Sequence, residues 1–165
     1  QVTYVLPQLW SWRGGGTQVQ LTPPNSPRAS AVIEALHLDT PMALDDKAVE
    51  AIRQQFTAFL PPGSNGATLI SEERDPVPLG GNLHSYEISA SYQALGAVYV
   101  RSILFVNTPD TQLRFKVTAP KAEFDALYRT FRASLTSWQW TKPAVPESSA
   151  AVAEANTPSA DRDAN

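Results

Sequence analysis

Residues 83–117, LHSYEISASYQALGAVYVRSILFVNTPDTQLRFKV, carry the clearest structural pattern in the sequence. This stretch contains three runs in which side chains alternate from one side of the chain to the other with a period of two, as they do along β-strands. The runs cover 83–92, 97–106 and 113–117. Short segments rich in turn-forming residues separate them, Gln93–Gly96 and Asn107–Asp110. Connections of this length join antiparallel neighbours, so the stretch predicts an antiparallel β-sheet.

The middle run, 97–106, is apolar on both faces, which is typical of a strand in the interior of a sheet. Arg101 is the exception, because it shares a face with Tyr99, Ile103 and Phe105. A buried charge is costly unless it is paired. Arg101 is therefore expected either to extend its charge to solvent or pair with an acid such as Glu87, or to contact an anionic ligand or partner in a shallow pocket.

Two amphipathic helices are expected beside these strands. The first carries an apolar stripe at three- and four-residue steps and ends at Pro61. Two residues are suitable N-caps for it: Thr40, which Pro41 follows, and Asp45. The second helix follows Pro120. The two apolar stripes are Ala48, Val49, Ile52, Phe56 and Phe59, and Phe124, Leu127, Tyr128, Phe131 and Leu135.

Three shorter strands are predicted upstream, at Thr17–Leu21, Ser30–Leu38 and Ala67–Ser71. For Ser30–Leu38 a helix is the alternative, favoured by its Ala, Glu and Leu residues, while its short length and the extended segment before it favour the strand. Gly14–Gly16 precede the first of them. A phosphate-binding loop needs wider glycine spacing, a following Lys and a helix, so this run predicts a flexible hinge.

The composition divides the chain into three parts. Residues 1–16 form a lead rich in aromatic residues and glycine, and 17–140 form a single α+β domain. Residues 141–165 consist mainly of Ala, Ser, Pro, Glu and Asn, which predicts a disordered tail because so few apolar side chains cannot offset the entropy lost on ordering.

The element order and several segments resemble the PsbP-like α/β/α sandwich superfamily. The segments are LISEERDPVPLGG (Leu69–Gly81), YEISASY (Tyr86–Tyr92), VYVRSILFV (Val98–Val106), LRFKVTAP (Leu113–Pro120) and EFDALYRTFRASLTSWQW (Glu123–Trp140). The resemblance covers Gln18 to Trp140. It implies an antiparallel sheet with two amphipathic helices packed on it, and a non-enzymatic scaffold that docks to other macromolecules. It supplies no catalytic residues.

Composition excludes some classes of function. The 165 residues carry a net charge of −3 without clustered Lys or Arg, which argues against nucleic-acid binding. The absence of cysteine excludes disulfides, thiolate metal sites and cysteine nucleophiles. No apolar run approaches the ~20 residues of a membrane span. The chain begins at Gln1, which is compatible with a cleaved signal peptide, a trimmed membrane anchor or an artificial start, and we expect an exported protein, with a cytoplasmic one as the alternative.

The titratable residues predict no catalytic, cofactor or metal site. His37 and His84 are too few for a histidine-built metal site, and no Gly-x-Ser-x-Gly elbow is present. Asp45 and Asp46 suit the start of a helix. The acidic residues of 72–75 are expected in a solvated turn.

Four tryptophans near the two ends of the domain remain: Trp10, Trp12, Trp138 and Trp140. They are expected to close the core where the two ends of the domain meet, or to form a binding hot spot with Arg101. The sequence thus predicts an accessory module that binds another protein of open identity. The alternatives are a small-molecule carrier with a pocket between sheet and helix, and an unrecognised hydrolase.

Overall fold

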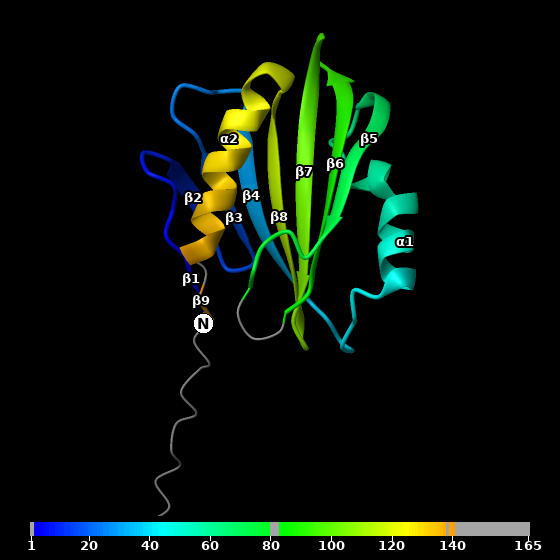
Figure 1. Ribbon diagram of the computed structural model, residues 1–165. Helices are drawn as coiled ribbons and strands as arrows, with labels where there is room; N and C mark the ends of the chain where they lie inside the picture. The colour runs from blue at the N-terminus through cyan, green and yellow to red at the C-terminus, as the bar shows by residue number, and fades with distance from the viewer. Residues whose placement is uncertain (1, 80–82, 138, 141–165) are drawn as a thin grey trace, which may run out of the picture.

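The computed structural model describes residues 2–79, 83–137 and 139–140 (Figure 1). Seven antiparallel strands form one sheet in the order β2-β3-β4-β8-β7-β6-β5. They are β2 Ser11–Gly15, β3 Gln18–Thr22, β4 Ser30–His37, β5 Asn65–Arg74, β6 Ser85–Ala94, β7 Ala97–Asn107 and β8 Thr111–Pro120. A second, two-stranded sheet pairs β1 (Val2–Thr3) with β9 (Gln139–Trp140), so the two ends of the described chain lie together.

The three predicted runs form the meander β6-β7-β8, and both faces of β7 are buried over most of its length. Its neighbours are in continuous register, from Ser85 opposite Val106 on one side to Asn107 opposite Gln112 on the other. The alternation and the short turns are therefore sufficient to specify this part of the sheet.

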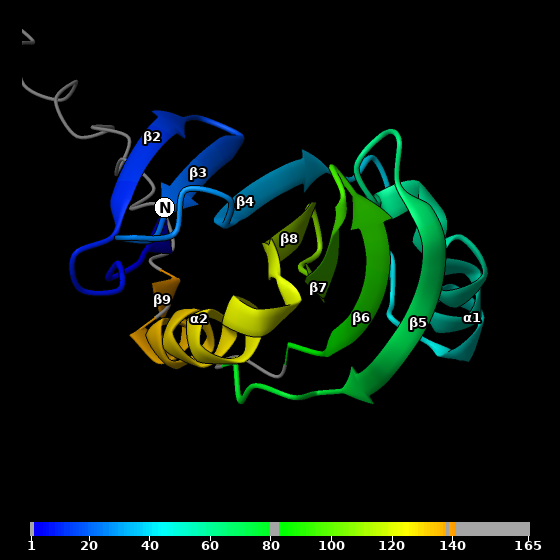
Figure 2. The same cartoon turned by 90° about the horizontal axis from the view of Figure 1, so that it is seen from above.

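The helices cover opposite faces of the sheet, which makes the fold an α/β/α sandwich (Figure 2). Helix α2 (Lys121–Ser134) packs over β7 and β8, and Phe124 and Phe131 are its buried side chains. Helix α1 (Asp46–Gln54) and the 3₁₀ helix η1 (Phe56–Phe59) lie on the other face. The core under α1 contains Val49, Tyr86, Ile88, Ile103 and Phe105.

Helix α1 starts at the second of the two expected positions. Asp45 is the N-cap, and its Oδ1 accepts a hydrogen bond from the backbone N–H of Ala48 at 2.9 Å. The helix also ends earlier than expected, at Gln54, and the apolar stripe continues through η1, where Phe56 and Phe59 pack against the same core.

The glycine run forms a hairpin instead of the expected flexible hinge. Residues 11–15 pair with β3, from Ser11 opposite Thr22 to Gly15 opposite Gln18, so the boundary that we drew at residue 16 falls inside a hairpin. Gly16 occupies the turn with φ +63°, which glycine adopts at little cost. The predicted tail, 141–165, lies outside the described residues.

Strand β5 is longer than predicted. Glu72 and Glu73 belong to this strand, and the solvated turn that we expected for them begins only at Asp75. Strand β5 lies at the edge of the sheet, and both acidic side chains are exposed there. Charged side chains suit an edge strand because they discourage pairing with other chains.

Replacing Gly14 by alanine is expected to lower the free energy of unfolding by about 1–3 kcal/mol. Gly14 has φ +100°, and an added Cβ would lie 2.6 Å from the carbonyl oxygen of Gln18. Gly15→Ala is the matched control, since its Cβ would meet nothing within 4 Å and its φ is not positive. Urea unfolding of both variants checks this, and equal stability of the two would show that Gly14 is not required for the hairpin.

Candidate functional site

One half of the sheet face that carries α1 has no helix on it. Helix α1 and η1 pack beside β5, β6 and β7, and η1 reaches Arg114 on β8 through Phe59. The same side of β2, β3 and β4 carries no described helix (Figure 2). We call this half the open face. It consists of the side chains that alternate toward it on β2, β3, β4 and β8, together with Arg101 at its border on β7.

Strand register brings basic residues from distant parts of the sequence onto the open face. Arg13 lies opposite Gln20, Gln20 opposite Val32, and Val32 opposite Lys116, which forms a row across four strands. The next rows, on either side, are Gln18, Glu34 and Arg114, and Ser30, Thr118 and Arg101. The open face thus carries the cations Arg13, Arg101, Arg114 and Lys116.

Glu34 is the single carboxylate at these strand positions, within a chain of net charge −3. It accepts a hydrogen bond from Lys116, with Nζ 2.8 Å from Oε1, so these two charges largely compensate each other. The remaining charge of the open face is therefore positive. Since both members of the pair are mostly buried, the pair also fixes the position of β4 against β8.

Arg101 does not pair with Glu87, contrary to one of the two expectations. Glu87 lies on the opposite face of β6, beneath α2. Arg101 instead donates from Nε to Thr118 Oγ1 and from Nη1 to the carbonyl oxygen of Phe59, each at 2.8 Å. Burial lowers the pKa of the Arg101 guanidinium, and the described residues place no carboxylate within 4.0 Å of it.

Arg114 also contacts Phe59 of η1, through the aromatic ring of that residue. Its guanidinium carbon lies 5.3 Å from the ring centroid of Phe59 and 5.7 Å from that of Phe105, within cation–π range. Its Nε donates to Gln112 Oε1 at 2.8 Å. Arg101 and Arg114 are thus two oriented cations that both contact Phe59. No carboxylate of the described residues forms an ion pair with either within 4.0 Å, and Glu34 attracts both over a longer distance.

The structure separates the four tryptophans. Trp10 is only 8 % exposed and stacks on Phe131 of α2, with ring centroids 6.2 Å apart, so it closes the core. Trp12 is 60 % exposed. The backbone of Trp140 belongs to β9, and the side chains of Trp138 and Trp140 lie outside the described residues.

A buried polar cluster lies between the sheet and α2. Tyr128 donates from its hydroxyl to Glu87 Oε1 at 2.5 Å, and Arg132 donates from Nη1 to the Tyr128 hydroxyl at 2.6 Å. Burial raises the pKa of Glu87, against the opposing effects of the hydrogen bond from Tyr128 and the charge of Arg132. The void beside this cluster has a volume of about 10 Å³, enough for a water molecule at most, so it does not provide the carrier pocket that we considered.

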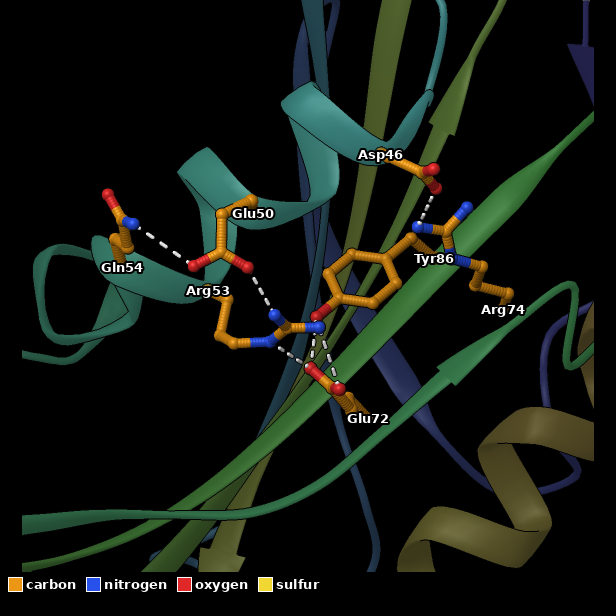
Figure 3. A network of polar contacts seen from close by, with 7 residues as sticks. All are labelled: Asp46, Glu50, Arg53, Gln54, Glu72, Arg74 and Tyr86. Carbon is orange, nitrogen blue, oxygen red and sulfur yellow. Dashed lines mark hydrogen bonds and ion pairs between the residues drawn. The ribbon is translucent and has the colours of Figure 1, made fainter.

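Two ion pairs join α1 to the edge strand β5, Arg53 with Glu72 and Arg74 with Asp46 (Figure 3). Arg53 donates from Nε and Nη2 to Glu72 at 2.6 and 2.8 Å, and Tyr86 donates to the same carboxylate at 2.8 Å. These hydrogen bonds, that from Arg53 first, lower the pKa of Glu72. Arg74 pairs with Asp46 at 2.6 Å. The network is structural, and the described residues contain no group of three acidic or histidine side chains placed to hold a metal ion.

Both histidines are exposed and each lies beside one aspartate. His84 Nδ1 is 3.3 Å from Asp75 Oδ2, and His37 Nε2 is 3.8 Å from Asp39 Oδ1. No hydrogen bond from either histidine to a serine is found within the described part of the chain. The α-helices of the described residues have 9 and 14 residues, fewer than the ~20 that a membrane span requires.

Comparison with known proteins places this sandwich among PsbP-like folds. No family model and no curated protein matches the sequence. Among solved structures, the cyanobacterial PsbP (CyanoP) of Synechocystis sp. PCC 6803 is similar, with a TM-score of 0.62 and 12 % identity over 85 % of this chain and 86 % of that one. The chain therefore has the PsbP-like fold that its segments resembled, and identities this low show the fold alone.

Two further bacterial proteins share this architecture. LpqN, a protein involved in cell envelope biogenesis of Mycobacterium tuberculosis, has a TM-score of 0.52 and 15 % identity over 84 % of this chain and 82 % of that one. A protein of Bacteroides thetaiotaomicron has a TM-score of 0.52 and 16 % identity over 86 % of this chain, which spans about half (46 %) of its length.

Sequence reasoning identified Arg101 but missed Arg13, Arg114 and Lys116. Arg114 and Lys116 alternate on β8 as predicted, and this was the available signal. The sequence does not reveal that β4, β3 and β2 extend this face as far as Arg13. Pairing between strands that are distant in sequence leaves no local pattern.

Proposed function

We propose that this chain is a non-enzymatic accessory module that docks to an acidic surface of another protein through the open face. The observation that carries the proposal is the excess of oriented cations over carboxylates on a helix-free half of the sheet. Complementary charge accelerates encounter and fixes the orientation of partners.

The setting of Arg101 and Arg114 supports an interface. Both guanidinium groups are held by η1 before any partner arrives, so little side-chain entropy remains to be lost on binding. Arginine beside an aromatic ring is also a frequent composition of binding hot spots. Val32 and Leu36 alternate with Glu34 on β4 and add partly exposed apolar surface for the partner to cover.

We further propose that the protein is exported and acts at the bacterial envelope. The support is the resemblance to PsbP-like proteins and the similarity of fold to LpqN, a protein of cell envelope biogenesis.

Charge reversal at Arg114 is expected to weaken partner binding at least about tenfold, since it replaces attraction by repulsion at one of the two oriented arginines of the proposed interface. The experiment identifies a stoichiometric partner of the wild-type protein by native mass spectrometry and then measures its affinity for Arg114→Glu. The matched control is Arg129→Glu, because Arg129 is exposed on α2 and, among the described residues, its guanidinium forms a hydrogen bond to the carbonyl oxygen of Asp125 alone. Equal losses in the two folded variants would refute docking through the open face.

A further inference from the structure

A hollow of about 540 Å³ lies where the β2–β3 hairpin meets the segment that leads into β4. Its size falls within the range of small-molecule sites, about 300–1,000 Å³. The lining is polar: Ser11, Arg13, Gln20, Thr22, Arg28 and Ser30 contribute most of it. It is distinct from the 10 Å³ void beneath α2 and lies on the other face of the sheet.

Two arginines give the hollow a positive charge, and none of the described residues that line it is a carboxylate. Neither Arg13 nor Arg28 has a carboxylate within 4.0 Å among the residues that the structure describes. Arg13 is nevertheless oriented, because its Nε and Nη2 both donate to Gln20 Oε1, at 3.0 and 2.7 Å. Its guanidinium is thus fixed across β2 and β3 beside the hollow.

Three hydroxyl groups complete the lining. Ser11 lies opposite Thr22 on the hairpin, and Ser30 begins β4 beside them. None of the three hydroxyls has a hydrogen-bond partner among the described residues, so each can donate to and accept from a ligand. Trp12 also lines the hollow and is 60 % exposed, which adds an apolar surface at its rim.

We infer that this hollow binds an anionic sugar, that is, a sugar-sized molecule with a phosphate or carboxylate group. Guanidinium groups match both oxyanions through paired N–H donors. The hydroxyl groups and the Gln20 amide can form hydrogen bonds with the hydroxyl groups of a sugar ring. The volume of the hollow is much larger than an inorganic anion needs. The hollow lies at the hairpin end of the open face and shares Arg13 and Gln20 with it. It also uses Arg28 and does not use Arg101 or Arg114, so sugar binding and protein docking can be tested by different variants.

The test is an NMR titration of the full chain with glucose 6-phosphate, glucuronate, uncharged glucose and inorganic phosphate. Saturable shifts at the amides of Arg28 and Ser30 are expected with at least one anionic sugar, and none with glucose. Comparing the affinity for glucose 6-phosphate with that for glucuronate shows whether the site prefers a phosphate or a carboxylate group. Arg28→Gln is expected to weaken binding about tenfold or more, and Arg129→Gln, on the exposed side of α2, to leave it unchanged.

Three outcomes would overturn the inference. The first is the absence of shifts with either anionic sugar up to about 10 mM, a concentration far above the dissociation constant of a specific site. The others are binding of glucose as tight as that of the anionic sugars, and binding of inorganic phosphate as tight as that of the sugars. Arg28 has no described side-chain partner, so its replacement is expected to preserve the fold, and Arg13→Gln supplies a second variant. The Arg114→Glu variant distinguishes the two sites. If it binds the sugar normally but no longer binds the protein partner, the sugar site is separate from the docking surface.

Discussion

Replacing Trp10 by alanine is expected to lower the free energy of unfolding by about 3–5 kcal/mol, the usual cost of removing a buried Trp or Phe side chain. Trp10 is 8 % exposed and stacks on Phe131 in the core beneath α2. Trp12→Ala, two residues away, is expected to change stability by less than about 0.5 kcal/mol because the side chain is largely exposed. Urea unfolding followed by far-ultraviolet circular dichroism measures both.

This difference would show that the N-terminal segment belongs to the fold. Beyond Trp10, the Tyr4 hydroxyl contacts Ser134 Oγ, and the backbone N–H of Val5 donates to Ser137 Oγ at 3.0 Å, so residues 4–10 cover the end of α2. Equal, small effects of the two tryptophan variants would instead show that residues 1–10 are dispensable for stability.

Replacing Arg132 by methionine is expected to destabilise the protein by about 3 kcal/mol at pH 7, because Glu87 then remains buried without its cation. Arg132 Nη1 lies 3.8 Å from Glu87 Oε1 and also donates to Tyr128, which donates to Glu87. Methionine preserves most of the side-chain volume, so loss of charge and of hydrogen bonds dominates the effect.

The pH dependence identifies the cause. Burial already raises the pKa of Glu87 above its value in the unfolded chain, so the folded state binds this proton more tightly and the stability from Glu87 decreases as pH rises toward neutrality. Without Arg132 the pKa rises further. The loss caused by Arg132→Met is therefore expected to be large at pH 7 and small near pH 4, where Glu87 is protonated.

The double variant Arg132→Met/Glu87→Gln is the control for this prediction. It removes the buried charge together with its partner and is expected to recover most of the stability at pH 7. A destabilisation that is the same at pH 4 and pH 7, with no recovery in the double variant, would show that Arg132 acts through packing rather than through the charge of Glu87.

The central sheet could be predicted from the sequence because its information is local. Strands β6, β7 and β8 alternate regularly and are joined by short turns, so pattern and topology coincide. The start of α1 was ambiguous because Thr40 and Asp45 are both suitable N-caps, and the structure selects Asp45 through its bond to Ala48. The length of β5 was underestimated because its acidic residues are paired by helices distant in sequence, Glu72 by Arg53 of α1 and Glu73 by Arg132 of α2.

The open face could not be predicted for the same reason. Arg13 and Lys116 meet in one row only because β3, β4 and β8 pair across nearly the whole domain. The partner of Arg101 was wrongly expected because Glu87 lies on the neighbouring strand but points to the other face, and its real partner, the carbonyl oxygen of Phe59, has no side-chain signature.

Site-specific photo-crosslinking in the organism of origin tests docking through the open face most directly. A photoreactive residue is placed at Gln18, on the open face, or at Ala126, exposed on α2. We expect that position 18 crosslinks to one protein through an acidic segment, that position 126 does not, and that Arg114→Glu abolishes the product. A stoichiometric crosslink from position 126, with none from position 18, would contradict docking through the open face.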